Sequence, residues 1–329
     1  MKEKFIPLCK EPRAVILDTD IGPDCDDAGA IAVLIYYAKK YNFPIIGAAN
    51  CTSNPAGNAT IKTLFEFCDY PTPPMAKWDG EGFFDQPRYC TYNTTVAERF
   101  QPDYMANEAK NIEPPVSFYR RLLASVPDKG VMLVTIGMFN NIAALLQSPA
   151  DATSPLDGRS LVEQKVYAVV CMACKYPEGR EFNVYCDYNA AREVLTGVNV
   201  PIYISDFHIG ASAQTNIKDL EARYAAEGRS AEENPIYLAY RLFTGSFSEG
   251  HCIRPTFDLT AVQFAVLGEG EYYGLENGPG RVEFYAGENG VEDCTRYVPD
   301  ELGNVWHMKK NAPDTVIAAE LEGILKSFN

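Results

Sequence analysis

Five aspartates crowd into ten positions of the stretch AVILDTDIGPDCDDAGAIAVL, directly after a run of four apolar residues. They are Asp18, Asp20, Asp24, Asp26 and Asp27. Carboxylates this close repel one another and raise one another's pKa unless a cation neutralises them. Asp24 or Asp26 could cap the helix that follows, because acids suit the free N–H groups of a first helical turn. Capping needs one or two acids and does not account for five, so the cluster predicts a metal site.

The ligand type limits which metal ions could bind. Carboxylate oxygens favour Ca²⁺ or Mg²⁺ over metals that prefer thiolate or imidazole. The EF-hand pattern fails, since Gly22 occupies a ligand position and no closing glutamate follows. The D-x-D at 18–20 is similar to that of phosphatases of the haloacid dehalogenase type, which carry Thr or Val where this chain has Gly22. Cys171 and Cys174 form an isolated C-x-x-C in an apolar run, which does not predict a zinc site.

Short apolar runs alternate with helical patterns along the first two thirds of the chain. The predicted strands are 14–17, 44–49, 131–136, 166–172 and 201–205, and the predicted helices are 27–41, 56–68, 115–126, 140–147 and 188–196. The strands are nearly continuous in apolar character, which is typical of strands covered on both faces. The pattern predicts an α/β fold with a mostly parallel central sheet and helices on both faces. Ligands of such sheets bind beyond the carboxyl ends of the strands, where the aspartates lie.

Two regions break this rhythm. Residues 70–112 are rich in Pro, Tyr, Asn and Gly and predict a long functional loop or lid. Beyond about residue 205 the chain becomes more helical, and it then predicts a strand pair at 281–286 and 303–308 and a closing helix. No internal repeat is present, so residues 1–329 are predicted to form a single domain.

Composition excludes several classes of partner. The 329 residues carry a net charge of −15, with no basic cluster denser than two lysines, which argues against a nucleic-acid partner. The sequence contains no run of 18 or more apolar residues, so we expect no membrane span. The N-terminus lacks the apolar stretch of a signal peptide. Ten singly scattered cysteines are typical of buried free thiols in a reducing compartment, so we expect a cytoplasmic protein.

The aspartate stretch resembles a known signature. ILDTDIGPDCDDAGAIAVL is similar to the motif D-T-D-x-G-x-D-D-A-x-A-I of the inosine/uridine-preferring nucleoside hydrolase family, and the longer I-G-P-D-C-D-D version resembles a hydrolase-like branch of it. Four further segments resemble the family in the same order, namely NCTSNPAGNATIKTL, TIGMFNNIAALL, EFNVYCDYNAA and PTFDLTAV. The resemblance covers residues 14–266, leaving 267–329 for the strand pair and the last helix. It implies a nucleoside hydrolase fold, which is Rossmann-like.

The resemblance also implies a reaction and its metal. It implies Ca²⁺-dependent hydrolysis of the N-glycosidic bond of a ribonucleoside or a related small riboside, which releases base and ribose. The implied calcium ligands are Asp20, Asp27, Asp258 and the main-chain oxygen of Asn140. Asp26 would be the base that takes a proton from a metal-bound water. That water would attack the anomeric carbon with inversion, since no covalent nucleophile is evident.

Other matched positions imply contacts to the sugar. Asn54, Glu181 and Asn183 would hold the sugar hydroxyls, and Met172 would pack beneath the ring. Members of the family are commonly dimers or tetramers, so the resemblance implies a homodimer or homotetramer.

The chain departs from the family pattern at the late motif. Phe257 stands where the family usually has a histidine that helps to protonate the leaving base. His251 and His208 are candidate replacements, although a lone histidine is more often structural. His307 falls in a predicted strand and is expected to be structural. Asp24, in the enlarged metal loop, competes with Asp26 for the role of base.

Two further regions leave their roles open. The short segment MACKYPEGRE brings Lys175 or Arg180 near the sugar, where either could meet a phosphorylated substituent or remain a solvated charge. Aromatic residues of the predicted lid could stack on a planar leaving group or simply pack within the lid; they are Trp78, Phe83, Phe84, Tyr89 and Tyr92.

Two alternatives to a nucleoside hydrolase remain open on sequence. The same metal site could act on a different glycosyl compound. The chain could also be a non-catalytic calcium-dependent sugar-binding protein, although binding alone does not require the base at Asp26.

Overall fold

The structure is a computed structural model that describes residues 5–80, 84, 86, 88, 91–245, 251–276, 278–288 and 290–329. Its strands are β1 Ala14–Thr19, β2 Ile45–Asn50, β3 Met75–Lys77, β4 Val131–Thr135, β5 Val166–Met172, β6 Glu178–Arg180, β7 Ile202–Ser205, β8 Gln214–Asn216, β9 Ile253–Pro255, β10 Tyr273–Leu275, β11 Gly280–Tyr285, β12 Cys294–Pro299 and β13 Val305–Lys310. Its helices are α1 Asp26–Tyr41, α2 Pro55–Phe67, α3 Asn93–Phe100, α4 Pro102–Asn107, α5 Pro115–Ala124, α6 Asn140–Leu146, α7 Gly158–Lys165, α8 Phe182–Cys186, α9 Tyr188–Gly197, α10 Phe207–Ala211, α11 Leu220–Ala226, α12 Pro235–Thr244, α13 Phe257–Leu267 and α14 Asp314–Leu325. Short 3₁₀ turns lie at Ala109–Asn111 and Ala231–Glu233.

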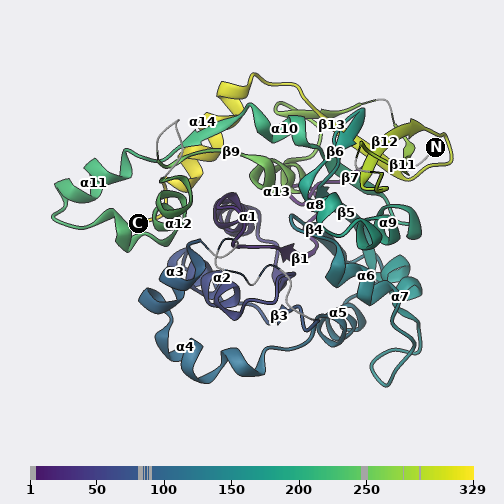
Figure 1. Ribbon diagram of the computed structural model, residues 1–329, viewed down its shortest axis with the longest axis horizontal. Helices are drawn as coiled ribbons and strands as arrows, with labels where there is room; N and C mark the ends of the chain where they lie inside the picture. Colours follow the sequence, from purple (N-terminus) through teal and green to yellow (C-terminus); the bar gives the residue numbers. More distant parts are fainter. Residues whose placement is uncertain are drawn as a thin grey trace.

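The central sheet is mostly parallel. Its strand order is β3-β2-β1-β4-β5-β7-β13-β11-β12-β6, with β10 paired to β13 off this path. The strands from β3 through β13 run parallel to one another, whereas β11, β12 and β6 are antiparallel. Helices surround the sheet (Figure 1). The predicted α/β class is therefore confirmed, and each of the five predicted strands and helices of the first two thirds is present.

Alternate residues of the inner strands feed two separate cores. In β1, Val15 and Leu17 pack into the core that contains α1 and α13, whereas Ile16 packs into the core that contains α5, α6 and α9. In β4, Met132 and Leu133 divide in the same way. Both faces of these strands are buried, which explains why their sequences are apolar throughout instead of alternating.

The expectation of one long loop at residues 70–112 is wrong for its second half. That half folds into α3, α4 and a 3₁₀ turn. Ala97 of α3 and Tyr104 of α4 pack against Ala56 and Ala59 of α2 in a small separate core. Many residues of α3 and α4 are polar and only a narrow face of each helix is apolar, so the composition of this region did not predict the helices. Phe83 and Tyr89, two of the aromatic residues considered above, lie outside the described residues.

The expected strands at 281–286 and 303–308 are present as β11 and β13, and they are antiparallel neighbours in the sheet. Their ladder is short, since it contains only the pair of Gly280 and Val305. Along its length β11 pairs with β12, a strand that the sequence did not predict because its residues do not form an apolar run and only the first two are buried. β13 also pairs with β7, which runs parallel to it.

Two general expectations can be compared with the described residues. Every described cysteine is a free thiol, and most of them are buried. Within the described ranges, no helix is both long enough and apolar enough to cross a membrane.

His307 lies on β13 and is buried, as expected of a structural residue. Its ring lies 5.0 Å from the ring of Tyr176 and 5.0 Å from that of Tyr297. Neither ring nitrogen has a hydrogen-bond partner among the described residues. Burial without a partner disfavours the imidazolium and lowers the pKa of His307 to about 3.

This burial predicts acid sensitivity. The unfolded chain takes up a proton near pH 6.5 and the folded protein only near pH 3, so stability from this residue is present above about pH 6.5 and is lost as the pH falls. We expect His307→Leu to reduce the loss of unfolding free energy between pH 7 and pH 5 by about 2 kcal/mol. Urea unfolding at a series of pH values measures this, with His208→Gln on the exposed part of α10 as control. Parallel curves for wild type and His307→Leu would contradict the buried neutral imidazole.

Candidate functional site

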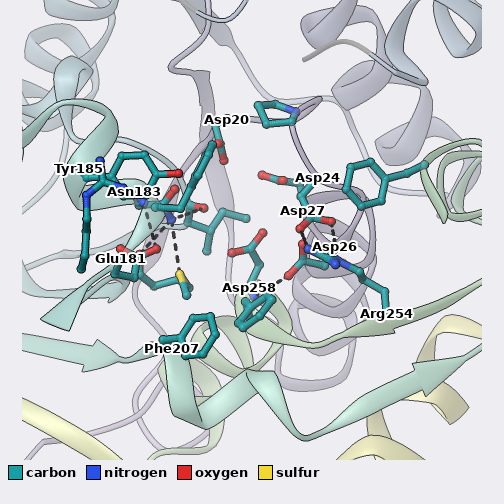
Figure 2. A pocket seen from close by; sticks show the side chains of 17 residues that line it. Asp20, Asp24, Asp26, Asp27, Glu181, Asn183, Tyr185, Phe207, Arg254 and Asp258 are labelled. Atoms are coloured by element: carbon teal, nitrogen blue, oxygen red, sulfur yellow. Dashed lines mark hydrogen bonds and ion pairs between the residues drawn. The ribbon is translucent and has the colours of Figure 1, made fainter. Parts of the chain in front are cut away.

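A cavity of about 470 Å³ lies beyond the carboxyl ends of β1, β4, β5 and β7. Six carboxyl side chains line it, namely those of Asp20, Asp24, Asp26, Asp27, Glu181 and Asp258. Figure 2 shows Asp26, Asp27 and Arg254 on one side, Glu181 and Asn183 on the other, and Asp258 between them. The cavity therefore combines an acidic centre with two chemically different walls.

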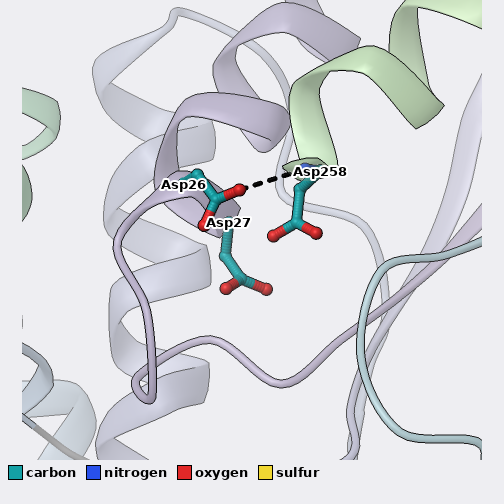
Figure 3. Close-up of side chains that lie close together, drawn as sticks. All are labelled: Asp26, Asp27 and Asp258. Atoms are coloured by element: carbon teal, nitrogen blue, oxygen red, sulfur yellow. Dashed lines mark hydrogen bonds between the residues drawn. The ribbon is translucent and has the colours of Figure 1, made fainter. Parts of the chain in front are cut away.

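Three of the carboxylates form a close group. Asp26 and Asp27 lie on the first turn of α1, and Asp258 lies on the first turn of α13. Each offers an oxygen, and these oxygens lie within 4.8 Å of one another (Figure 3). The main-chain N–H of Asp258 donates to Oδ2 of Asp26 at 3.0 Å. Two helices that pack side by side thus bring together acids more than 200 positions apart, a donor set that suits a hard cation such as Ca²⁺.

Burial and mutual repulsion dominate the electrostatics of this group. Asp26, Asp27 and Asp258 are each buried, and burial raises the pKa of each carboxyl well above its ordinary value. The neighbouring carboxylates raise these pKa values further. Asp20 has a raised pKa for the same two reasons. A divalent cation among the carboxylates would offset both effects, so the residues fit a metal.

The carboxylates of the close group differ from the expected carboxylate ligands in one residue. Asp26 belongs to it, whereas Asp20 lines the same cavity outside it. Asn140 is buried at the start of α6, and its Nδ2 donates to the main-chain oxygen of Cys51 at 2.9 Å. Oδ1 of Asn140 is buried without a hydrogen-bond partner among the described residues, although Asn140 does not itself line the cavity.

The loop between β1 and α1, which carries the acids, is held by Tyr92 and Asn93 at the start of α3. The Tyr92 hydroxyl donates to the main-chain oxygen of Asp24 at 2.8 Å, and Nδ2 of Asn93 donates to that of Ile21 at 2.8 Å. Gly22 takes a φ of 137°, which side chains rarely adopt. The buried position of Tyr92 shows that it packs beneath the loop and does not stand in the cavity.

Asp18, the first acid of the cluster, does not line the cavity. Its Oδ2 accepts hydrogen bonds from the Tyr119 hydroxyl at 2.5 Å and from Nδ2 of Asn141 at 3.0 Å. Burial raises the pKa of Asp18 to about 7 in spite of these bonds. Asp18 therefore ties β1 to α5 and α6 from below the site.

Asp24 pairs with Arg254 and does not act as the helix cap considered above. Nε of Arg254 donates to Oδ1 of Asp24 at 2.8 Å, and Nη2 donates to the other carboxylate oxygen. Cys25 holds the cap position of α1 without a side-chain cap bond. Sequence reasoning missed Arg254, whose only signal is that it lies in the short strand β9, four positions before Asp258.

The opposite wall contains the predicted sugar-contacting residues Met172, Glu181 and Asn183. Glu181 caps α8 and accepts hydrogen bonds from the main-chain N–H groups of Asn183 at 2.9 Å, Val184 at 3.2 Å and Cys174 at 3.1 Å. Burial nonetheless raises the pKa of Glu181 to about 7. Nδ2 of Asn183 donates to the main-chain oxygen of Met172 at 3.1 Å. These contacts fix a polar wall built from the end of β5 and the start of α8.

Besides Asn140, three further candidate residues do not reach the cavity lining. Oδ1 of Asn54 caps α2 by accepting the N–H of Ala56 at 2.9 Å. His208 lies on the exposed side of α10. Nε2 of His251 lies 2.7 Å from a carboxylate oxygen of Glu221. The structure therefore brings neither histidine to the place that Phe257 occupies.

Phenylalanines line the cavity beside the acids. Phe207, Phe243 and Phe257 all contribute, and the rings of Phe207 and Phe257 lie 5.4 Å apart. The Arg254 guanidinium lies 5.1 Å from the ring of Phe243 and 5.6 Å from that of Phe257. Phe207 lies two positions after the end of β7, so a search for residues close behind predicted strands would have found it.

Comparisons with known proteins agree with this arrangement. The profile of the family described as inosine-uridine preferring nucleoside hydrolase matches residues 15–318, which extends beyond the 14–266 expected from the motifs. No curated protein sequence matches the chain.

Solved structures resemble the chain over almost its whole length. An inosine-uridine preferring nucleoside hydrolase from Bacillus anthracis has 14% identity and a TM-score of 0.65, covering 96% of this chain and 98% of its own. An inosine-guanosine nucleoside hydrolase has 17% identity and a TM-score of 0.68, with 96% and 99% covered. The type III effector protein XopQ, solved with adenosine diphosphate ribose, has 14% identity and a TM-score of 0.64, with 96% and 94% covered. At these identities the likeness is one of fold.

The crowded acids predict that removing one charge stabilises the metal-free protein. The raised pKa of Asp258 means that the folded state holds its proton more tightly than the unfolded chain does, so stability falls as the pH rises above about 4. With a chelator present, we expect Asp258→Asn to raise the unfolding free energy at pH 8 by about 1–2 kcal/mol. The difference should shrink towards pH 4, where wild-type Asp258 is protonated as well. Denaturant unfolding at both pH values measures it, and a less stable variant at pH 8 would contradict the repulsion.

Proposed function

The chain belongs to the inosine-uridine preferring nucleoside hydrolase family and is a nucleosidase, and from that premise we propose that this cavity hydrolyses ribonucleosides with the help of calcium. The observation that carries the proposal is the close group of Asp26, Asp27 and Asp258 in the lining of a cavity with a polar wall. The products are the free base and ribose, and the reaction breaks the N-glycosidic bond.

We propose that Asp20, Asp27, Asp258 and the main-chain oxygen of Asn140 hold a Ca²⁺ ion. All four donors are oxygens, and calcium accepts six to eight oxygens in flexible geometry, so this set leaves room for sugar hydroxyls. When bound, the ion lowers the pKa of a coordinated water and neutralises the surrounding carboxylates. The Thr19 hydroxyl donates to Asp27 and holds that carboxylate in place.

Asp26 is proposed as the base that takes the proton from the attacking water. Its Oδ2 accepts the N–H of Asp258, which orients the carboxylate and leaves Oδ1 for the water. An exchange of roles between Asp26 and Asp20 is the main competing assignment, because Asp26 is the one that lies in the close group. Asp24 is a weaker candidate, since Arg254 engages both of its oxygens.

The polar wall is proposed to hold the sugar. Glu181 and Asn183 face the cavity across from the carboxylates (Figure 2), at a place where their polar atoms can meet hydroxyl groups. The thioether of Met172 offers an apolar surface beneath the ring. Asn54 is also proposed to contact the sugar, and its Oδ1 caps α2 by accepting the N–H of Ala56.

A second candidate substrate class keeps the same site. Arg180 lines the cavity beside Glu181, and its guanidinium lies 3.6 Å from the ring of Tyr185. A cation there would suit a phosphorylated riboside, and XopQ, which has the same fold, was solved with adenosine diphosphate ribose. Nε of Arg180 is already 2.8 Å from Asp293, which weakens this candidate. The homo-oligomeric state, the cytoplasmic location and the single domain stay predictions.

The first test follows base release. We expect the calcium-loaded protein to release free base from at least one ribonucleoside of a panel, and excess chelator to stop the release, because the carboxylates then lack their counter-ion. Chromatography of the free base measures both. A panel that also contains adenosine diphosphate ribose separates the two substrate classes. Bound calcium without any release would refute the proposal and leave either a hydrolase of a different glycosyl compound or a sugar-binding protein.

The second test separates base from ligand. We expect Asp26→Asn to lower kcat about 10²–10⁴-fold, the usual contribution of a general base, with calcium affinity reduced much less. Asp20→Asn should instead weaken calcium binding, measured by calorimetry, because it removes a ligand. The reverse pattern would assign the base to Asp20. Asp103→Asn, on the first turn of α4 and outside the cavity, serves as the matched control and should alter neither quantity.

A further inference from the structure

Among its described side chains, the aromatic side of the cavity has no acid apart from Asp24, whose two carboxylate oxygens are held by Arg254. Its other described side chains are Phe207, Phe243, Phe257 and Arg254, and a guanidinium stays protonated at any ordinary pH. Glu181 and Tyr185, which do carry dissociable protons, belong to the opposite wall (Figure 2). Three N–H groups also hold the Glu181 carboxylate. A planar leaving group stacked on the phenylalanines would therefore meet no free acid among the described residues that line the cavity. The ring of His208 and the ammonium of Lys175 lie 5.5 Å and 5.4 Å from the ring of Phe207, but neither residue lines the cavity.

The charge of the leaving group decides whether that matters. When the bond between the anomeric carbon and the ring nitrogen breaks, the electron pair stays on the nitrogen. A neutral purine or pyrimidine then departs as an anion unless an acid protonates it. A ring nitrogen that is already cationic, as in an N-ribosyl pyridinium, departs as a neutral heterocycle. In that case water adds its oxygen to the anomeric carbon, its proton passes to the carboxylate base, and no other proton is needed.

The charge of the cavity favours the same class. Six carboxyl groups and two guanidinium groups line it, so it stays acidic even after a divalent cation has offset two negative charges. The phenyl faces of Phe207, Phe243 and Phe257 attract cations through their quadrupoles. The net charge of −15 adds a long-range attraction for cationic substrates.

The positive charge of Arg254 would repel a cationic ligand, but the carboxylate of Asp24 already neutralises it. The guanidinium is bidentate on Asp24 and lies against the rings of Phe243 and Phe257. This pair is neutral overall and presents a flat surface next to the aromatic rings. An anionic ring substituent is the one ligand that Arg254 would favour instead.

We propose that the preferred substrates are ribosides of cationic heteroaromatic rings, whose leaving groups depart neutral against Phe207, Phe243 and Phe257. The inference rests on the proposed calcium-dependent hydrolase function and names its substrate class. It makes Phe257 a specificity-determining residue.

The experiment compares nicotinamide riboside, which is cationic, with inosine and uridine, which are neutral. We expect kcat/KM of the calcium-loaded protein to be about 100-fold or more higher for nicotinamide riboside, the lower end of what a missing general acid costs a neutral substrate. The KM for nicotinamide riboside should rise with ionic strength, whereas that for inosine should not. Equal or faster hydrolysis of inosine would overturn the inference while leaving the hydrolase function in place. No hydrolysis of any riboside would instead refute the proposed function itself.

Two variants separate the enzyme's preference from the intrinsic lability of the pyridinium bond. Phe257→His places a proton donor at the aromatic wall and should raise kcat/KM for inosine at least about tenfold relative to nicotinamide riboside. Phe328→His, outside the cavity near the C-terminus, is the matched control and should leave the ratio unchanged. An unchanged ratio in a Phe257→His protein that still binds calcium would contradict the inference. Nicotinate riboside has the same cationic ring with an added carboxylate, so a preference for it over nicotinamide riboside would still support the cationic-ring class and would assign the added carboxylate to Arg254.

Discussion

The repulsion between buried carboxylates is the constraint on which the site depends. Asp26, Asp27 and Asp258 lie within a few ångströms of one another and away from bulk water, an arrangement that costs free energy in the absence of a cation. The fold pays for this elsewhere, with inner strands buried on both faces and with α1 packed along α13. The same repulsion favours the binding of a divalent cation, which would neutralise the carboxylates. The repulsion therefore both destabilises the metal-free cluster and increases its affinity for the ion.

The sequence could predict the parts of the fold whose signal is local. The buried strands β1, β4 and β5 are continuous apolar runs, and the aspartates follow the first of them, so class and site edge were both predictable. The partner of Asp24 was not, because Arg254 lies 230 positions away and only the packing of β9 brings it near. The capping role of Asn54 was also hidden, since a motif match does not show which hydrogen bond the side chain makes.

The ion pair of Asp24 and Arg254 gives the acidic loop a counter-charge of its own. It neutralises one of the cavity's carboxylates permanently, whatever metal or substrate is present. Coulombic attraction to Arg254 also lowers the pKa of Asp26, opposing the rise caused by burial and by Asp24. The proposed base is therefore set between an acid and a cation, and its basicity reflects the balance of the two.

The polar wall is anchored at the far edge of the sheet. β6 ends at Arg180, directly before Glu181, and it pairs with β12, where Arg180 lies opposite Cys294. The Arg180 guanidinium also meets the buried Asp293. A strand that slips by one residue turns every side chain to the opposite face. An insertion or deletion within β12 would thus reach the polar wall as a change of register. This distant edge of the sheet can therefore tolerate substitutions far better than changes in strand length.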